Sequence, residues 1–142
     1  MMHLKKIIYI LFIVLAQVQL STAQETSTIE LNSSLLMANA WKIDQFYIDS
    51  VLVKDNPSPV HHYYSNHTFV RSKIDTLVAG MSWQLLDANK IKVFSIERNY
   101  SEIIDIIVLA PGLFVARQSV VGSDGKSYLL EYRFKPYIKS LN

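Results

Sequence analysis

Residues 80–109 constrain the fold of this chain more than any other stretch. Three runs rich in apolar, β-branched and aromatic residues, at 80–86, 91–96 and 102–109, are separated by short polar segments. Such residues favour strands, and short turns can join only antiparallel neighbours. The rhythm is therefore typical of an antiparallel meander, and most of the chain after residue 40 repeats it.

About eight strands are expected in all, with turn signals between them. Every connection after residue 60 is short, which favours an up-and-down order. Closing such a sheet into a barrel would remove its exposed edges. The sequence thus predicts an all-β, antiparallel, up-and-down barrel of about eight strands. The expected strands are 41–54, 60–64, 68–74, 80–86, 91–96, 102–109, 113–120 and 127–134.

Alternation within the strands predicts which side chains face the interior. In a strand with one buried face, apolar residues recur at every second position. This rule favours an outward Asp105, with Ile104, Ile106 and Val108 on the inner face. In strand 41–54 the alternation changes phase near residues 46–48, which indicates a bulge or a bend. In the last strand, the residues expected on the inner face are Tyr128, Leu130, Tyr132 and Phe134.

The first residues have the pattern of a secretory signal peptide. Lys5 and Lys6 precede an apolar run at 7–15, and the small residues Ser21 and Ala23 then occupy the positions that signal peptidase reads. We expect cleavage after Ala23 and export to the periplasm or the extracellular space. An uncleaved membrane anchor is the alternative, although the apolar run is shorter than the ~20 residues that span a bilayer.

Cleavage of the first 23 of 142 residues would leave 119, which is one domain by length. The chain has 14 basic and 12 acidic residues, and two of its lysines lie in the signal peptide, so the exported part is formally neutral. Neutrality argues against nucleic acid as a partner. The chain has no cysteine, so its core alone must hold it. The expected segments are signal peptide 1–23, flexible lead 24–34, barrel domain 35–137 beginning with a short helical turn at 35–40, and tail 138–142.

Residues 35–137 resemble a lipocalin-like domain of the small secreted type found in Gram-negative bacteria. The resemblance rests on Asn-Ala-Trp-Lys-Ile at 39–43 and on segments 64–69 and 80–91. In this family, a Trp in the first strand packs under a basic residue from the last strand. The resemblance implies that Trp41 pairs with Arg133 through a cation–π contact, and that the barrel interior holds a small apolar or amphipathic ligand.

Aromatic residues are the best candidates for ligand contacts. Phe69, Trp83, Tyr132 and Phe134 are expected inside the barrel, where they would either line a cavity or fill the interior. Arg117 would meet an anionic group of the ligand if its side chain is internal, and a surface position is the alternative. We therefore take these five residues as the candidate ligand-binding set.

Patterns for other chemistry are weak. His61, His62 and His67 lie close in sequence, but their spacing matches no zinc motif, and a solvated loop or edge is the default expectation. Ser82 lacks the Gly-x-Ser-x-Gly context of a nucleophile. The sequence thus predicts no catalytic residue, metal site or cofactor, and no membrane span after signal cleavage. The alternative function is a filled-barrel interaction or inhibitor module that binds another exported protein through loop 55–62.

Overall fold

The computed structural model describes residues 17, 23–54, 59–73, 76–77 and 81–138. Within them, all strands belong to one sheet and every pairing is antiparallel. The strands are β1 (Ala40–Ile48), β2 (Val51–Leu52), β3 (Val60–Tyr63), β4 (Thr68–Lys73), β5 (Thr76–Leu77), β6 (Met81–Asp87), β7 (Lys90–Ser95), β8 (Tyr100–Ala110), β9 (Leu113–Val121) and β10 (Ser127–Pro136).

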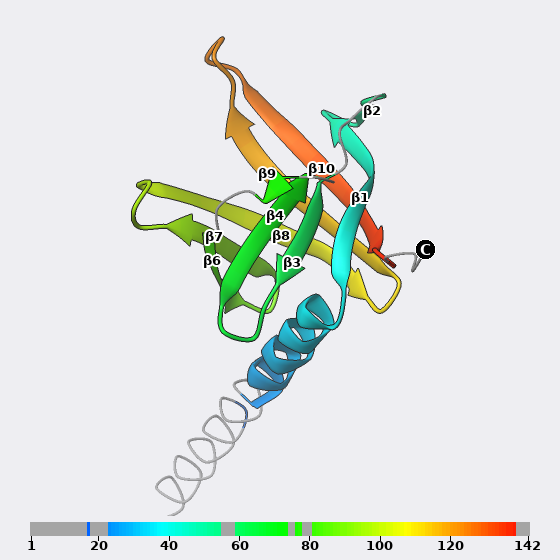
Figure 1. Ribbon diagram of the computed structural model, residues 1–142, viewed down its shortest axis with the longest axis vertical. Helices are drawn as coiled ribbons and strands as arrows, with labels where there is room; N and C mark the ends of the chain where they lie inside the picture. Colours follow the sequence, from blue (N-terminus) through cyan, green and yellow to red (C-terminus); the bar gives the residue numbers. More distant parts are fainter. Residues whose placement is uncertain (1–16, 18–22, 55–58, 74–75, 78–80, 139–142) are drawn as a thin grey trace, which may run out of the picture.

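The sheet closes into a barrel. Neighbours along the chain pair from β6 to β10, and β1 pairs with β3 on one side and with β10 on the other. The ring therefore contains eight strands, while β2 and β5 are two-residue additions at its rim. This is the up-and-down architecture of lipocalin barrels, and the predicted fold class is confirmed (Figure 1).

Bulges in β1 and β8 affect which side chains face inward. The register of β1 against β10 shifts between Ile43 and Gln45, just before the phase change seen in the sequence. A second shift lies between Ile106 and Val108 in β8. Asp105 points outward as predicted, but Val108 is exposed, because the bulge turns it away from the inner face. The inner-face prediction for Val108 is therefore wrong.

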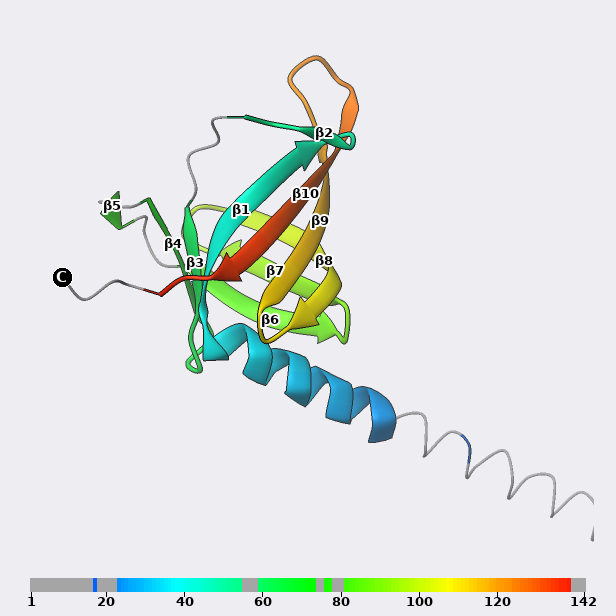
Figure 2. The same cartoon turned by 90° about the vertical axis from the view of Figure 1, so that its right-hand side faces the viewer.

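The segment before the barrel is a helix, residues 23–38, where the sequence predicted a flexible lead and a short turn. Its Ser and Thr content argued against a helix. Thr28 and Ser34 are accommodated in it by donating their hydroxyls to backbone carbonyls one turn earlier. The helix lies under one end of the barrel (Figures 1 and 2). Leu36 is fully buried there, and Asn32 Nδ2 donates to Ala88 O at 2.6 Å.

Aromatic rings pack the half of the interior that lies next to this helix. We call the set defined at the end of this paragraph the aromatic core. Tyr63 of β3 contacts Phe114 of β9, with ring centroids 6.4 Å apart, although these strands are not neighbours. Side chains therefore meet across the interior and fill this half. The aromatic core consists of Trp41, Tyr63, Phe69, Trp83, Phe114 and Phe134.

Several predictions fall outside the described residues. Only residue 23 of the cleavage region and the isolated residue 17 are described from the predicted signal peptide, and loop residues 55–58 and tail residues 139–142 are not described. The division of the chain into exported domain and leader stays a prediction. In the described part of the chain, no helix has the length and apolar character needed to cross a membrane.

Candidate functional site

A group of polar side chains lies along the inner face of the sheet, on the side of the aromatic core away from the helix, and extends to the exposed Tyr100. Along the β3–β4 hairpin, the pair Tyr63 and Phe69 stands next to the turn, and the next inward pair is His61 and Arg71. The Nη2 atom of Arg71 lies 2.9 Å from Oε1 of Glu102. Since β6 and β7 separate β4 from β8 in the ring, this ion pair crosses the interior. The polar cluster consists of His61, Arg71, Tyr100, Glu102 and Gln118.

Glu102 is the most completely bonded member of the polar cluster. Its side chain is only 8% exposed. Besides Arg71 at Oε1, its Oε2 accepts hydrogen bonds from Tyr100 Oη at 2.6 Å and from Gln118 Nε2 at 3.2 Å. Burial, together with the bond to this carboxylate, raises the pKa of Tyr100 to about 12. Tyr100 therefore stays a donor at neutral pH, and the carboxylate is held from three sides.

Glu102 compensates the charge of Arg71, but part of the Arg71 guanidinium is open to solvent. Its Nε donates to Nε2 of His61 at 3.3 Å, and its guanidinium carbon lies 5.7 Å from the centroid of the Phe69 ring. The guanidinium also interacts with the hydroxyl of Tyr100. The side chain is 32% exposed, so part of the guanidinium reaches solvent. Arg71 can therefore still donate to a group that approaches from the solvent side.

His61 is buried, which corrects the expectation of a solvated loop or edge. It stands on the inner face of β3, where its ring centroid lies 5.3 Å from that of Phe69 and 4.9 Å from that of Phe134. Burial, and then the positive charge of Arg71, hold the pKa of His61 well below its usual value. Because Nε2 accepts from Arg71, the neutral ring carries its proton on Nδ1.

Two buried polar atoms inside the barrel lack a partner among the described residues. They are Nδ1 of His61 and Oη of Tyr63. Leaving such a group unsatisfied costs about 1–3 kcal/mol. Burial raises the pKa of Tyr63, so its hydroxyl stays protonated. The interior therefore offers unused hydrogen-bonding capacity next to the ion pair.

The buried state of His61 predicts acid sensitivity in a defined window. Its folded pKa lies below 6.5, so the unfolded chain binds more protons below pH 6.5 and stability should fall there, by up to ~1.4 kcal/mol per pH unit. Above pH 6.5 this contribution should be constant. Urea unfolding at pH 7.5, 6.5 and 5.5 measures the slope.

A His61→Gln variant should lose most of this slope. His62 is the matched control, because burial lowers its pKa too, but it is far less buried, so His62→Gln should retain most of the slope. A slope that survives unchanged in His61→Gln would contradict the assignment.

The predicted ligand-binding residues divide between the two faces. Phe69, Trp83 and Phe134 are buried in the aromatic core. Tyr132 is half-buried and stacks on Phe46, with centroids 4.9 Å apart, on the inner face. Arg117 lies on the outer face, where its Nε donates to Oε2 of Glu131 at 2.8 Å. The surface alternative for Arg117 is therefore the one observed.

The implied pair of Trp41 and Arg133 is corrected. Trp41 is fully buried, packs edge-on against Phe114 and donates through Nε1 to the carbonyl of Leu36 at 3.0 Å. Arg133 instead stacks on Tyr47, with its guanidinium carbon 4.9 Å from the ring centroid. The reason is strand alternation, which turns Phe134 inward and its neighbour Arg133 outward.

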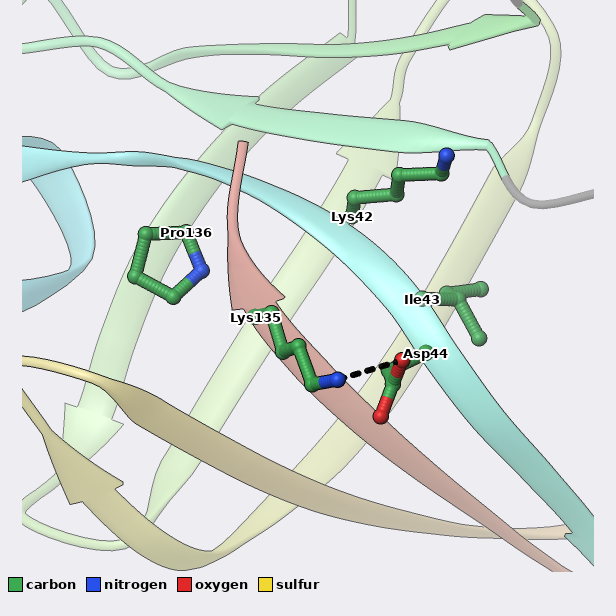
Figure 3. A pocket seen from close by; sticks show the side chains of 5 residues that line it. All are labelled: Lys42, Ile43, Asp44, Lys135 and Pro136. Atoms are coloured by element: carbon green, nitrogen blue, oxygen red, sulfur yellow. Dashed lines mark ion pairs between the residues drawn. The ribbon is translucent and has the colours of Figure 1, made fainter. Parts of the chain in front are cut away.

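Hollows on the outer face are weaker candidates for a site. One of about 330 Å³ lies beside the paired strands β1 and β10 (Figure 3). Lys135 Nζ lies 2.8 Å from Asp44 Oδ1 there, and the Lys42 side chain points away from that pair. A ligand at this place would stay in contact with water, whereas small-molecule sites usually bury most of the ligand. Its lining residues are Lys42, Ile43, Asp44, Lys135 and Pro136.

Arg71 and Glu102 were missed by the sequence analysis, although the signal was present. Arg71 follows the inward Phe69 by two positions, and Glu102 precedes the inward Ile104 by two. The same alternation that placed the apolar residues also placed these two charges inside.

Comparison with known proteins finds related architecture only in solved structures. Protein-family models and curated protein sequences give no match. Bovine odorant binding protein in complex with a selenium-containing odorant is 12% identical, with a TM-score of 0.48 over 76% of this chain and 74% of that chain. Its complex with undecanal is 10% identical, with a TM-score of 0.44 over 72% of each chain. A deswapped triple mutant of the same bovine protein is 13% identical, with a TM-score of 0.41 over 72% of this chain and 73% of that chain.

Proposed function

We propose that this chain is an exported binding protein that holds a small amphipathic molecule in the half of its barrel away from the helix. The polar cluster carries the proposal. A buried ion pair and unpartnered polar atoms reduce stability relative to apolar packing. In a domain without disulfides, keeping them inside the barrel is better explained by recognition of a ligand than by stability.

Apolar contacts for such a ligand are available beside the polar cluster. Phe46 and Tyr132 stack on the inner face of β1 and β10, and both are only partly buried. Further along β10 and away from the helix, Leu130 also faces inward and pairs with Ile48. An eight-stranded barrel is wide enough for its own side chains or for one small ligand. The filled half next to the helix would then serve as the floor of the site.

Export is supported by the N-terminal pattern described above. The signal-peptide pattern of residues 1–23 and the neutral charge of the remainder suit a protein that works in the periplasm or outside the cell. The proposal does not depend on which of the two compartments applies.

Two adjacent leucines of β10 provide the test. Leu130 faces inward and Leu129 faces outward, 40% exposed. Titration calorimetry with 1-decanol should show binding to the wild type. Leu130→Arg would place a charge in the ligand's path and should weaken binding at least about tenfold, or 1.4 kcal/mol. Leu129→Arg should bind as the wild type does. Equal affinities for both variants, or no binding by the wild type, would refute the site.

A filled-barrel interaction module remains the second candidate. It is favoured by the aromatic core and by exposed apolar residues on the outer face of β8 and β9, among them Ile103, Ile107 and Leu113. Contact through loop 55–62 cannot involve the His61 side chain, because it is buried. Native mass spectrometry of protein from its own cell envelope separates the candidates. A retained small molecule supports the first, and a retained polypeptide supports the second.

A further inference from the structure

The polar cluster is electrically balanced before any ligand enters. Arg71 contributes one positive charge and Glu102 one negative charge, at a separation of 2.9 Å. His61 and Tyr100 are neutral at pH 7, because of the pKa shifts described above, and Gln118 is uncharged. A ligand therefore meets a dipole here and not a free cation.

The carboxylate of Glu102 is held in place by three neighbouring side chains. Tyr100 and Gln118 hold its second oxygen, and Arg71 holds the first. A ligand carboxylate that approached Arg71 would stand next to this buried carboxylate. Two carboxylates that share one site repel each other unless one takes up a proton. The partly desolvated position makes that repulsion stronger than it would be in water.

Arg71 nevertheless has a donor for an uncharged acceptor. The side chain is 32% exposed, so N–H groups of the guanidinium that do not face Glu102 or His61 can be reached from solvent. A hydroxyl, carbonyl or ester oxygen would accept from it without adding charge, and the bond would be strengthened by the positive donor. Resting on the proposed function, we infer that the natural ligand carries an uncharged oxygen group, which Arg71 binds, and that Glu102 excludes carboxylates.

Matched ten-carbon probes test this selectivity. At pH 8, where decanoate is ionised, the wild type should bind 1-decanol at least about tenfold more tightly than decanoate. Glu102→Gln leaves the charge of Arg71 uncompensated, so its affinity for decanoate should rise at least about tenfold while that for 1-decanol changes little. Glu131→Gln removes a carboxylate from the outer face and should leave the wild-type preference intact.

Each outcome has a distinct meaning. A wild type that binds decanoate as tightly as 1-decanol would overturn the selectivity while leaving the proposed function standing. An unchanged ratio in Glu102→Gln would also overturn it. If Glu102→Gln does not fold, Arg71→Met/Glu102→Gln replaces it. That variant should lose about tenfold in 1-decanol affinity and gain none for decanoate, and any other result would refute the inference. Binding of neither probe by any variant would refute the proposed function itself.

Discussion

Replacing Arg71 with Met should destabilise the protein by about 3 kcal/mol or more. The substitution keeps most of the aliphatic stem and removes the charge that compensates Glu102. That carboxylate is only 8% exposed, so it would be left as a buried and unpaired charge. Removing one partner of a buried ion pair typically costs about 3–5 kcal/mol. Urea unfolding at pH 7.5 measures the loss.

An exposed ion pair of the same barrel provides the control. Lys90 Nζ lies 3.6 Å from Asp105 Oδ1, and the two side chains are 48% and 52% exposed. Such surface pairs contribute less than about 1 kcal/mol, so Asp105→Asn should have little effect. If Asp105→Asn lowered the free energy of unfolding as much as Arg71→Met does, burial would not explain the expected difference between the two ion pairs.

Phe114→Ala should destabilise the protein by about 3–5 kcal/mol. Phe114 of β9 is fully buried, where it meets aromatic rings from three other strands. Its ring centroid lies 5.6 Å from that of Trp41, 4.8 Å from that of Phe134 and 6.4 Å from that of Tyr63. Truncation would leave a cavity. The neighbouring rings belong to different strands of the sheet, so they cannot easily move together to fill it.

Phe94 is the matched control for this truncation. It lies on the outer face of β7, where Lys92 Nζ stands 5.4 Å from its ring centroid. Phe94→Ala loses a partly exposed contact, and we expect a change below about 1 kcal/mol. Comparable losses for Phe94→Ala and Phe114→Ala would contradict the placement of the aromatic core inside a closed barrel.

The barrel itself was accessible from the sequence, because strand alternation and short turns are local signals. Phe69, Trp83 and Phe134 were expected inside on that basis, and they are buried. Only the last turn of the helix at 23–38 was predicted, because the helix is stabilised by packing of Leu36 and Asn32 against the barrel end more than by its own propensity.

The polar cluster escaped prediction for a different reason. Arg71 and Glu102 are 31 positions apart and lie on strands separated by two others in the ring. In the sequence, a charged residue at an inward position is an exception to the alternation of apolar and polar residues. Its partner can be identified only from the closed ring, which brings the two side chains together. The position of Arg133 over Tyr47 likewise follows from the register of β1 and β10.

The coupling energy between Arg71 and Glu102 tests the central claim most directly, because only a closed barrel lets β4 and β8 face each other. It is obtained from the unfolding free energies of the wild type, Arg71→Met, Glu102→Gln and the double variant. The double variant should be more stable than the sum of the single losses predicts, by about 2 kcal/mol or more. Losses that add within about 0.5 kcal/mol would contradict a buried pair across the barrel interior.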